Sequence, residues 1–310
     1  MTEAVATPQS FPEVDVVIAT RNRPELLRQA VGAVLAQDYP GPIHCLVVFD
    51  QSEPDRALEQ RGINRTVRVT SNRRTPGLAG ARNSGIVASA SPYVAFCDDD
   101  DVWLPSKVRS QVAALHGSAA LTSVSGIIVE YEGRAVPRVP RAEDVTLARL
   151  VRNRVMEAHP SSVLVRRSAL EGVIGLVDEH IPGSYGEDFD WILRAAQAGG
   201  FAVVEEPLVK VRWGTSMFSQ NWQTIIDSID YSLDKHTVFH QDPLALGRLY
   251  GRRAFALAAL GRRREGLRAC WRTIRTSPKE KRAYLAAVVS LNLVSAQRLM
   301  DAAHKRGHGI

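Results

Sequence analysis

Four consecutive aspartates, Asp98 to Asp101, are the residues of this chain whose type and spacing most clearly suggest chemistry. They directly follow the apolar residues 93–97. Adjacent carboxylates at the end of a buried strand repel one another unless a cation or a proton neutralises them. Hard oxygen ligands favour Mg2+ or Mn2+, which bind one or two carboxylates and complete their shell with phosphate oxygens. The run therefore predicts a metal site; an acidic cap on a following helix is the alternative, and the two are compatible.

The elements that must position these carboxylates alternate between strand and helix. Apolar, β-branched runs predict strands, and 3.6-residue periodicity after the first run and after a glycine-rich stretch predicts helices. This alternation favours an α/β fold, a Rossmann-like and mainly parallel sheet flanked by helices, with ligands at the carboxyl ends of the strands. The predicted strands are Val14–Thr20, Ile43–Phe49, 67–70, 93–97, 124–131, 161–167 and 201–213, and the helices include 77–90 and 186–199.

Two local features refine this assignment. Asn22 precedes Pro24 and Glu25, which predicts that Asn22 caps the first helix. Residues 133–143 are rich in proline and arginine, so we expect an irregular connection that could face a substrate.

The C-terminal third of the chain is predicted to be helical. The expected segments are 221–240, 243–260, 262–276 and 278–304. Ser277 to Glu280 resembles a capping box with proline at the first helical position. We therefore expect a flexible N-terminus at residues 1–13, a catalytic domain at 14–219 and a helical C-terminal appendage at 220–310.

The positive net charge of +6 is concentrated in the C-terminal region. Residues 247–282 contain ten arginines and two lysines but only two acidic residues. Such a segment could bind an anionic membrane or a phosphate-bearing acceptor, or form a solvated helix face. Peripheral membrane contact and a homodimer are both expected from this region, whereas nucleic acid is not an expected partner.

The remaining composition indicates a cytoplasmic protein. Cys45, Cys97 and Cys270 are odd in number and lack metal-site or disulfide spacing. No basic segment followed by an apolar one opens the chain, so no secretory signal is expected. The uncharged residues 283–296 are fewer than the ~20 needed to cross a bilayer as a helix. We expect a cytoplasmic location, and the basic region suggests that the protein could also contact the inner face of the membrane.

Five segments resemble successive blocks of the inverting family 2 glycosyltransferases, and they occur in the family's order between residues 16 and 195. They are VVIATRNRPELLRQAVGAVLAQ, VVFDQSE, GLAGARNSGI, YVAFCDDDDVWLPSKV and GEDFDWILRA. The resemblance implies a GT-A fold and transfer of a hexosyl or deoxysugar residue from a UDP-, dTDP- or GDP-linked donor. It also implies Mn2+ or Mg2+ held at a DxD motif, and a glycan, lipid-linked or small-molecule acceptor.

The resemblance assigns donor-site roles to residues of the first four blocks. Asp50 would accept a hydrogen bond from the base, and Arg82 would pair with phosphate, with a surface ion pair as the alternative. Asp98 would contact ribose or metal, and Asp100 would coordinate the ion; Asp101 is expected to cap the following turn. The donor-binding set implied by the resemblance is Thr20, Arg21, Asn22, Asp50, Gly80, Arg82, Asn83, Asp98, Asp99 and Arg212, with Asp98 and Asp100 as metal ligands.

The acceptor side draws on the last block. Asp188 would act as the general base on the acceptor hydroxyl, with helix capping as its alternative role. Glu187, Trp191 and His159 would contact the acceptor, although Trp191 could equally fill the core and His159 could be structural.

Two positions depart from the family's pattern. Arg21 stands where many members have an aromatic residue, so a guanidinium plane would have to stack on the base. Trp213 stands near the position where many members place a histidine that binds the metal. Two alternative functions are a nucleotidyltransferase, which would release pyrophosphate, and a non-catalytic module that binds nucleotide or docks on a membrane.

Overall fold

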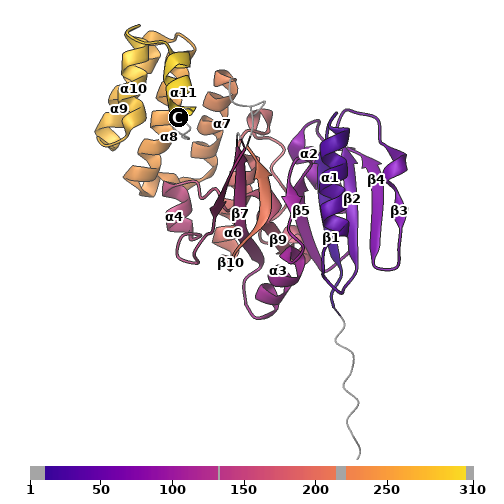
Figure 1. Ribbon diagram of the computed structural model, residues 1–310. Helices are drawn as coiled ribbons and strands as arrows, with labels where there is room; N and C mark the ends of the chain where they lie inside the picture. Colours follow the sequence, from indigo (N-terminus) through magenta and orange to yellow (C-terminus); the bar gives the residue numbers. More distant parts are fainter. Residues whose placement is uncertain (1–10, 132, 214–220, 305–310) are drawn as a thin grey trace, which may run out of the picture. The chain divides into compact units, whose positions relative to one another are not determined.

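The computed structural model describes residues 11–131, 133–213 and 221–304, which form two compact units (Figure 1). Of these residues, the first unit contains 11–147, 155–179 and 188–213, and the second contains 148–154, 180–187 and 221–304. The predicted flexible residues 1–13 lie mostly outside the described residues, and so does the predicted boundary at 219 and 220. Two short segments from the middle of the chain belong to the same unit as the C-terminal helices, which no local sequence pattern indicated.

A ten-stranded sheet forms the centre of the first unit, in the order β3-β4-β2-β1-β5-β9-β7-β10-β6 with β8 paired to β7. The strands are β1 (Val14–Thr20), β2 (Ile43–Phe49), β3 (Gln60–Arg61), β4 (Arg65–Ser71), β5 (Tyr93–Asp98), β6 (Val102–Trp103), β7 (Thr122–Tyr131), β8 (Arg134–Arg138), β9 (Val163–Arg166) and β10 (Phe201–Arg212).

The sheet is mainly parallel, which confirms the predicted α/β class. Strands β4, β2, β1 and β5 run parallel to one another, and β10 runs parallel to β7. All seven residues of β1 are buried, as the continuous apolar run of a strand covered on both faces requires. Val14 aligns with both Ile43 and Tyr93, so the polar residues that follow β1, β2 and β5 emerge at one edge of the sheet.

The prediction of an irregular connection at 133–143 was wrong for its first half. Residues Arg134–Arg138 form β8, an antiparallel partner of β7. Its first four residues are exposed, and it contains Pro137. A strand at the edge of a sheet buries no apolar face, so it lacks the alternation by which a strand is identified in sequence.

The helices of the first unit begin close to their predicted positions, but the predicted cap was wrong. Helix α1 begins at Pro24 with Arg23 in the capping position and no side-chain hydrogen bond, and Asn22 adopts a left-handed conformation with φ of 54°. Asparagine tolerates that conformation better than most residues, and it turns the chain from β1 into the helix. The helices are α1 (Pro24–Leu35), α2 (Leu78–Ala88), α3 (Lys107–His116), α5 (Arg167–Glu171) and α6 (Glu187–Ala198).

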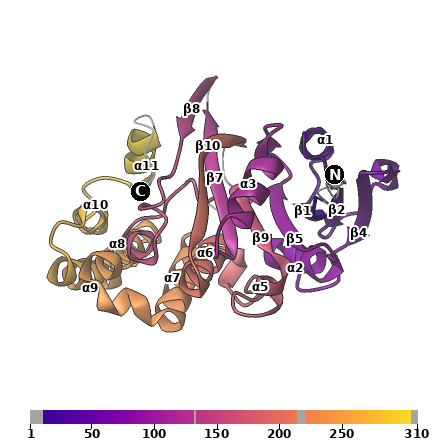
Figure 2. The same ribbon diagram turned by 90° about the horizontal axis from the view of Figure 1, so that it is seen from below.

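The second unit is helical, as predicted for its C-terminal part, and α8 packs on both α9 and α10 (Figures 1 and 2). Its helices are α4 (Leu147–Arg152), α7 (Trp222–Lys235), α8 (Pro243–Ala259), α9 (Arg263–Thr276), α10 (Lys281–Ser290) and α11 (Ala296–His304). The single helix predicted at 278–304 is two helices, and the first begins at Lys281 with Glu280 as its cap. Within the described residues, no helix has the length and apolar character that crossing a membrane requires.

Lys107 is a fully buried cation at the start of α3. Its Nζ lies 3.7 Å from the centre of the Trp103 ring and has no hydrogen-bond partner among the described residues. Burial lowers the pKa of Lys107 to about 7, because the charged ammonium loses its hydration. In the unfolded chain the amine keeps its usual pKa of 10.5.

Replacing Lys107 with Met is therefore expected to stabilise the protein. Between about pH 7 and 10.5 the unfolded chain binds a proton at Lys107 that the folded chain lacks, so this residue makes stability rise with pH. Lys107→Met should unfold at higher urea concentration at pH 7, and its advantage over the unchanged protein should shrink as the pH approaches 10. An advantage that stays constant across this range, or a loss of stability at pH 7, would contradict the assignment.

Candidate active site

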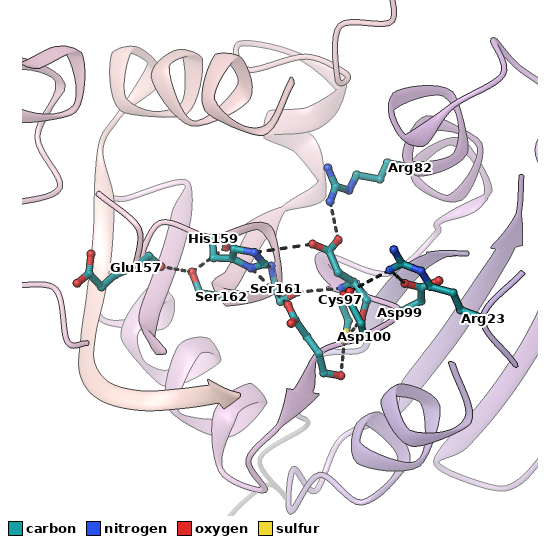
Figure 3. A network of polar contacts seen from close by, with 11 residues as sticks. Arg23, Arg82, Cys97, Asp99, Asp100, Glu157, His159, Ser161 and Ser162 are labelled. Atoms are coloured by element: carbon teal, nitrogen blue, oxygen red, sulfur yellow. Dashed lines mark hydrogen bonds and ion pairs between the residues drawn. The ribbon is translucent and has the colours of Figure 1, made fainter. Parts of the chain in front are cut away.

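The candidate site lies at the carboxyl ends of β1, β2 and β5, where Asp98 ends β5 and the other three aspartates follow it (Figure 3). Arg82 Nη2 donates a hydrogen bond of 2.5 Å to Asp98, and Arg23 Nη1 contacts Asp99 at 3.1 Å and Asp100 at 2.9 Å. Thr20 at the end of β1 donates its hydroxyl to Asp99 over 2.7 Å. The guanidinium groups of Arg82 and Arg23 thus offset part of the negative charge of the four carboxylates.

The four carboxyl groups differ in how well the charged form is stabilised. Burial alone would raise the pKa of Asp98, but Arg82 and His159 lower it below the usual range. Burial raises the pKa of Asp99 and of Asp100, and it raises that of Asp101 well above the usual value, with the charge of Asp98 adding to the effect. Asp98 is therefore the firmest anion of the run.

Asp101 and His159 form the part of the site that can accept a cation. Asp101 is 1% exposed, and its Oδ2 accepts no hydrogen bond from the described residues. His159 Nδ1 lies 3.4 Å from that oxygen, and His159 Nε2 lies 3.9 Å from Asp98 Oδ2. Ser161 fixes the turn by accepting the backbone N–H of Asp98 at 2.9 Å.

One ligand atom from each of Asp98, Asp101 and His159 lies within 4.8 Å of the other two. Two carboxylates and an imidazole are a donor set that suits Mn2+ and also accommodates Mg2+ through its oxygens. A cation there would balance the buried oxygen of Asp101, so these residues fit a divalent ion. Asp98 was predicted as a ligand, whereas Asp100 lies outside this group and pairs with Arg23.

Asp50 lies directly after β2 and is held by a loop from a neighbouring segment. Its carboxylate accepts hydrogen bonds from Asn72 Nδ2 at 2.8 Å, Gln51 Nε2 at 2.9 Å and the backbone N–H of Gly77 at 3.1 Å. Although burial opposes it, these bonds lower the pKa of Asp50. Asp50 therefore remains an anionic acceptor at neutral pH, whereas the supporting role of Asn72 was not predicted.

The first turns of α2 carry Gly80 and Asn83, and both residues make their contacts inside the protein. A Cβ at Gly80 would lie 1.9 Å from the carbonyl oxygen of Thr75, so glycine is required for this close approach of two backbone segments. Asn83 is 1% exposed, and its Nδ2 donates to the Val177 carbonyl at 2.8 Å and to Glu179 at 2.7 Å. Both amide hydrogens of Asn83 are thus used inside the protein.

Glu179 is a further residue that the sequence did not single out. It accepts hydrogen bonds from Arg74 Nε at 2.5 Å and from the backbone N–H of Thr75 at 3.2 Å. Burial opposes the shift, but bonds from Thr75, Asn83 and Arg74 lower the pKa of Glu179 to about 2. This carboxylate ties the loop before α2 to the segment after α5.

Three of the predicted donor-binding residues have exposed side chains. Arg21 and Asn22 follow β1, and Arg212 ends β10, where its guanidinium is 3.4 Å from Gln29 Oε1. Trp213, near the position where the resemblance implies a histidine, is 39% exposed and packs edge-on against Tyr131. Its indole supplies no metal ligand, whereas His159 supplies an imidazole nitrogen from another segment.

The first turn of α6 carries the predicted base. Asp188 is half-buried, and Glu187 is buried. Trp191 is 4% exposed, its ring packs edge-on against Phe96, and its N–H donates to the Gly175 carbonyl at 3.2 Å. Of the two roles considered for Trp191, the structure supports the core role.

The fold is of the α/β class, in which ligands bind at the carboxyl ends of the strands of a mainly parallel sheet, and the charged side chains of this site lie there. The family model described as "Glycosyl transferase family 2" matches residues 15–174, so the chain belongs to this family. Its members transfer sugars, which decides for an enzyme and against the nucleotidyltransferase and non-catalytic alternatives.

Two curated relatives illustrate the range of the family. The succinoglycan biosynthesis protein ExoO of Rhizobium meliloti is 29% identical over 63% of this chain and 58% of its own length. WfgD of Escherichia coli, named as a UDP-Glc:alpha-D-GlcNAc-diphosphoundecaprenol beta-1,3-glucosyltransferase, is 24% identical over 33% of this chain and 40% of its own length. The match thus spans less than two thirds of either relative.

Two solved structures share the fold. TarS of S. aureus in complex with UDP-GlcNAc matches with a TM-score of 0.62 and 15% identity, covering 96% of this chain and 92% of that one. The mannosyltransferase PcManGT of Pyrobaculum calidifontis, in complex with GDP-Man and Mn2+, matches with a TM-score of 0.56 and 15% identity, covering 96% and 85%. At this identity the likeness establishes the glycosyltransferase fold alone.

The metal ligands can be identified by substitution. Asp101→Asn and His159→Ala should each weaken Mn2+ binding at least about tenfold, since even the outer partners of metal ligands cost that much when removed. Asp100→Asn should change it little, because Asp100 is paired with Arg23. Calorimetry of Mn2+ in the presence of saturating UDP or GDP measures all three, and an effect confined to Asp100→Asn would instead support the DxD ligand expected from sequence.

Proposed function

We propose that this family 2 glycosyltransferase moves a sugar from a nucleoside diphosphate to an acceptor hydroxyl with inversion at the anomeric carbon. The observation that carries the proposal is the joint placement of Asp50, Arg82 and the group Asp98, Asp101 and His159 at one edge of the sheet. An acceptor for a base, a cation for phosphate and a donor set for a metal are the three contacts that such a donor requires.

The donor base is proposed to hydrogen-bond with Asp50, whose lowered pKa keeps it an anion that can accept a ring N–H. Uracil, thymine and guanine each offer such a donor, consistent with UDP-, dTDP- or GDP-linked sugars. Thr20 ends β1 and is followed by Arg21 and Asn22, at the same edge of the sheet as Asp50. These three residues are proposed to contact the base and the ribose, and Arg212 is proposed as a further contact to the donor. Gly80 and Asn83 contribute indirectly, because they hold the loop that donates to Asp50.

The diphosphate is proposed to lie beside Asp98, with Arg82 close enough to share its charge between this carboxylate and a phosphate oxygen. Asp98, Asp101 and His159 would hold Mn2+ or Mg2+. A bound ion would offset the negative charge that develops on the departing nucleoside diphosphate. Arg23 and Thr20 keep Asp99 and Asp100 compensated, so the ion does not have to balance the whole run.

Asp188 is proposed as the general base that removes the proton from the acceptor hydroxyl as its oxygen attacks the anomeric carbon. A single displacement of this kind inverts the configuration and needs no covalent enzyme intermediate. Glu187 is proposed to orient the acceptor from the same turn, with His159 available from the metal side.

Asp188→Asn is expected to lower kcat by about two to four orders of magnitude, the usual contribution of a positioned general base. The amide keeps the size of the side chain, so donor binding measured by calorimetry with Mn2+ should stay within about twofold of the unchanged protein. Asp234→Asn, an exposed change on α7, serves as the control. Turnover near the original rate would show that another group removes the proton.

The exposed face of α9 is proposed to attach the enzyme to an anionic membrane surface. Trp271 is 63% exposed and Leu267 is 38% exposed. Three exposed arginines lie at helical spacing on the same side, at positions 264, 268 and 275, while Gly266, Cys270 and Thr273 face the interior. An aromatic ring flanked by cations is the pattern of a helix that lies in the membrane interface.

Vesicle flotation tests this attachment. The full chain should float with vesicles containing phosphatidylglycerol at low salt, and Trp271→Ala combined with Arg268→Glu should reduce the bound fraction at least about tenfold, because each basic residue contributes about 1 kcal/mol near such a surface. Lys279→Glu, outside α9, is the charge-matched control. Equal flotation of all variants would contradict the proposal, and a concentration-dependent dimer that Trp271→Ala dissolves would assign the face to a homodimer instead.

A further inference from the structure

The second unit contains four arginines that the proposed sugar transfer does not use, namely Arg154, Arg248, Arg252 and Arg282. Arg248 and Arg252 are four residues apart on α8, so their side chains share one face of that helix. Arg282 lies in the first turn of α10, and Arg154 follows the end of α4.

Specific contacts bring these three segments together. Arg152 at the end of α4 forms an ion pair of 2.5 Å with Asp242, the residue that caps α8. Glu280, the cap of α10, lies against α8 so closely that a Cβ at Gly251 would be 2.6 Å from its Cγ. Arg282 Nη1 donates to Glu280 at 2.9 Å, and Arg252 Nη2 donates to the Tyr185 hydroxyl at 2.7 Å.

The positive charges of this cluster repel one another. Burial and the positive charges of Arg252, Arg282 and Arg154 together lower the pKa of Arg248 to about 9, with Glu280 opposing the shift. Burial and the charges of Arg154 and Arg282 also lower the pKa of Arg252. A guanidinium does not relieve such repulsion by releasing its proton at neutral pH, so the repulsion persists there.

One N–H of the cluster also lacks an acceptor. Arg282 Nε is shielded from solvent and donates no hydrogen bond to any of the described residues. A buried donor of this kind is destabilising unless an acceptor is supplied. An anion with several oxygen atoms would meet both needs at once, because it adds negative charge among the guanidiniums and accepts their N–H groups.

We propose that Arg154, Arg248, Arg252 and Arg282 form a binding site for a phosphate or diphosphate group. Planar guanidinium groups match the geometry of phosphate oxygens and bind them through paired hydrogen bonds. Because several guanidinium charges lie close together, a doubly charged anion offsets more of their repulsion than a singly charged carboxylate does. The Tyr185 hydroxyl, already held by Arg252, marks one border of the site.

Two sources can supply this group. One is free inorganic phosphate or pyrophosphate acting as an effector, and the other is a phosphate that forms part of the acceptor. The site itself stands independently of the proposed sugar transfer, whereas the second source rests on it.

Calorimetry of the full chain with inorganic pyrophosphate tests the site, in EDTA and at constant ionic strength so that metal-dependent binding at the donor site is suppressed. Arg248→Gln combined with Arg282→Gln should weaken pyrophosphate binding at least about tenfold, since a lost charge-assisted hydrogen bond costs that much. Arg268→Gln on α9 and Asp50→Ala in the donor site should bind as the unchanged protein does. Equal binding by all four proteins, or loss only in Asp50→Ala, would overturn the proposal.

A thermal melt in chloride buffer separates loss of a site from loss of the fold. The single variant Arg248→Gln and the double variant should melt at the same temperature as the unchanged protein or higher, because repulsion among the guanidiniums is reduced. A clearly lower melting temperature would contradict the proposal, since the arginines would then support the structure itself.

Transfer kinetics with GlcNAc-diphosphoundecaprenol as the acceptor distinguish the two sources. If pyrophosphate inhibits competitively against the acceptor and the double variant loses this inhibition, the site binds the diphosphate of the acceptor. If pyrophosphate inhibits non-competitively against the acceptor and the double variant loses that inhibition, the site binds a free effector. Inhibition that persists unchanged in the double variant would contradict the site. An absence of transfer by the unchanged protein would count against this acceptor and leave the calorimetric result standing.

Discussion

The structure depends on the compensation of four negative charges at the end of one buried strand. Without partners, the carboxylates of Asp98 to Asp101 would repel one another in a region that water reaches poorly. Arg82 from α2, Arg23 before α1 and Thr20 from β1 each take part of this charge. The placement of these elements at one edge of the sheet is therefore an electrostatic requirement as well as a topological one.

The compensation is uneven, and this unevenness gives the site its chemistry. Asp99 and Asp100 share Arg23, and Asp98 has Arg82, but a buried oxygen of Asp101 accepts no hydrogen bond within the described part of the chain. That oxygen lies beside His159, which offers an imidazole nitrogen. Asp98, Asp101 and His159 each place one possible ligand atom within 4.8 Å of the other two, so His159 offers an imidazole nitrogen from a segment other than that of Trp213.

The sequence was a good guide wherever a signal is local. The bounds of β1 and β2 could be predicted to the residue because each is a continuous apolar run between polar loops. Strand β8 could not, because it is exposed, and the left-handed turn at Asn22 was mistaken for a helix cap. Asp50 and the aspartates could be singled out by their positions after strands.

The supporting contacts of the site could not be predicted, because they join segments far apart in the sequence. Asn72 reaches Asp50 and Glu179 reaches Asn83 only through the folded loops, and His159 approaches Asp101 across more than fifty residues of chain. The assignment of residues 148–154 and 180–187 to the helical unit is likewise a property of packing rather than of composition. The arginine cluster of that unit was visible in the sequence only as an excess of charge.

The proposed donor site can be tested most directly by anomalous diffraction from crystals grown with Mn2+ and a nucleoside diphosphate. A manganese peak within bonding distance of Asp98, Asp101 and His159, with the base of the nucleotide hydrogen-bonded to Asp50, is the predicted result. A nucleotide bound away from Asp50, or a manganese peak that none of these three residues contacts, would contradict it.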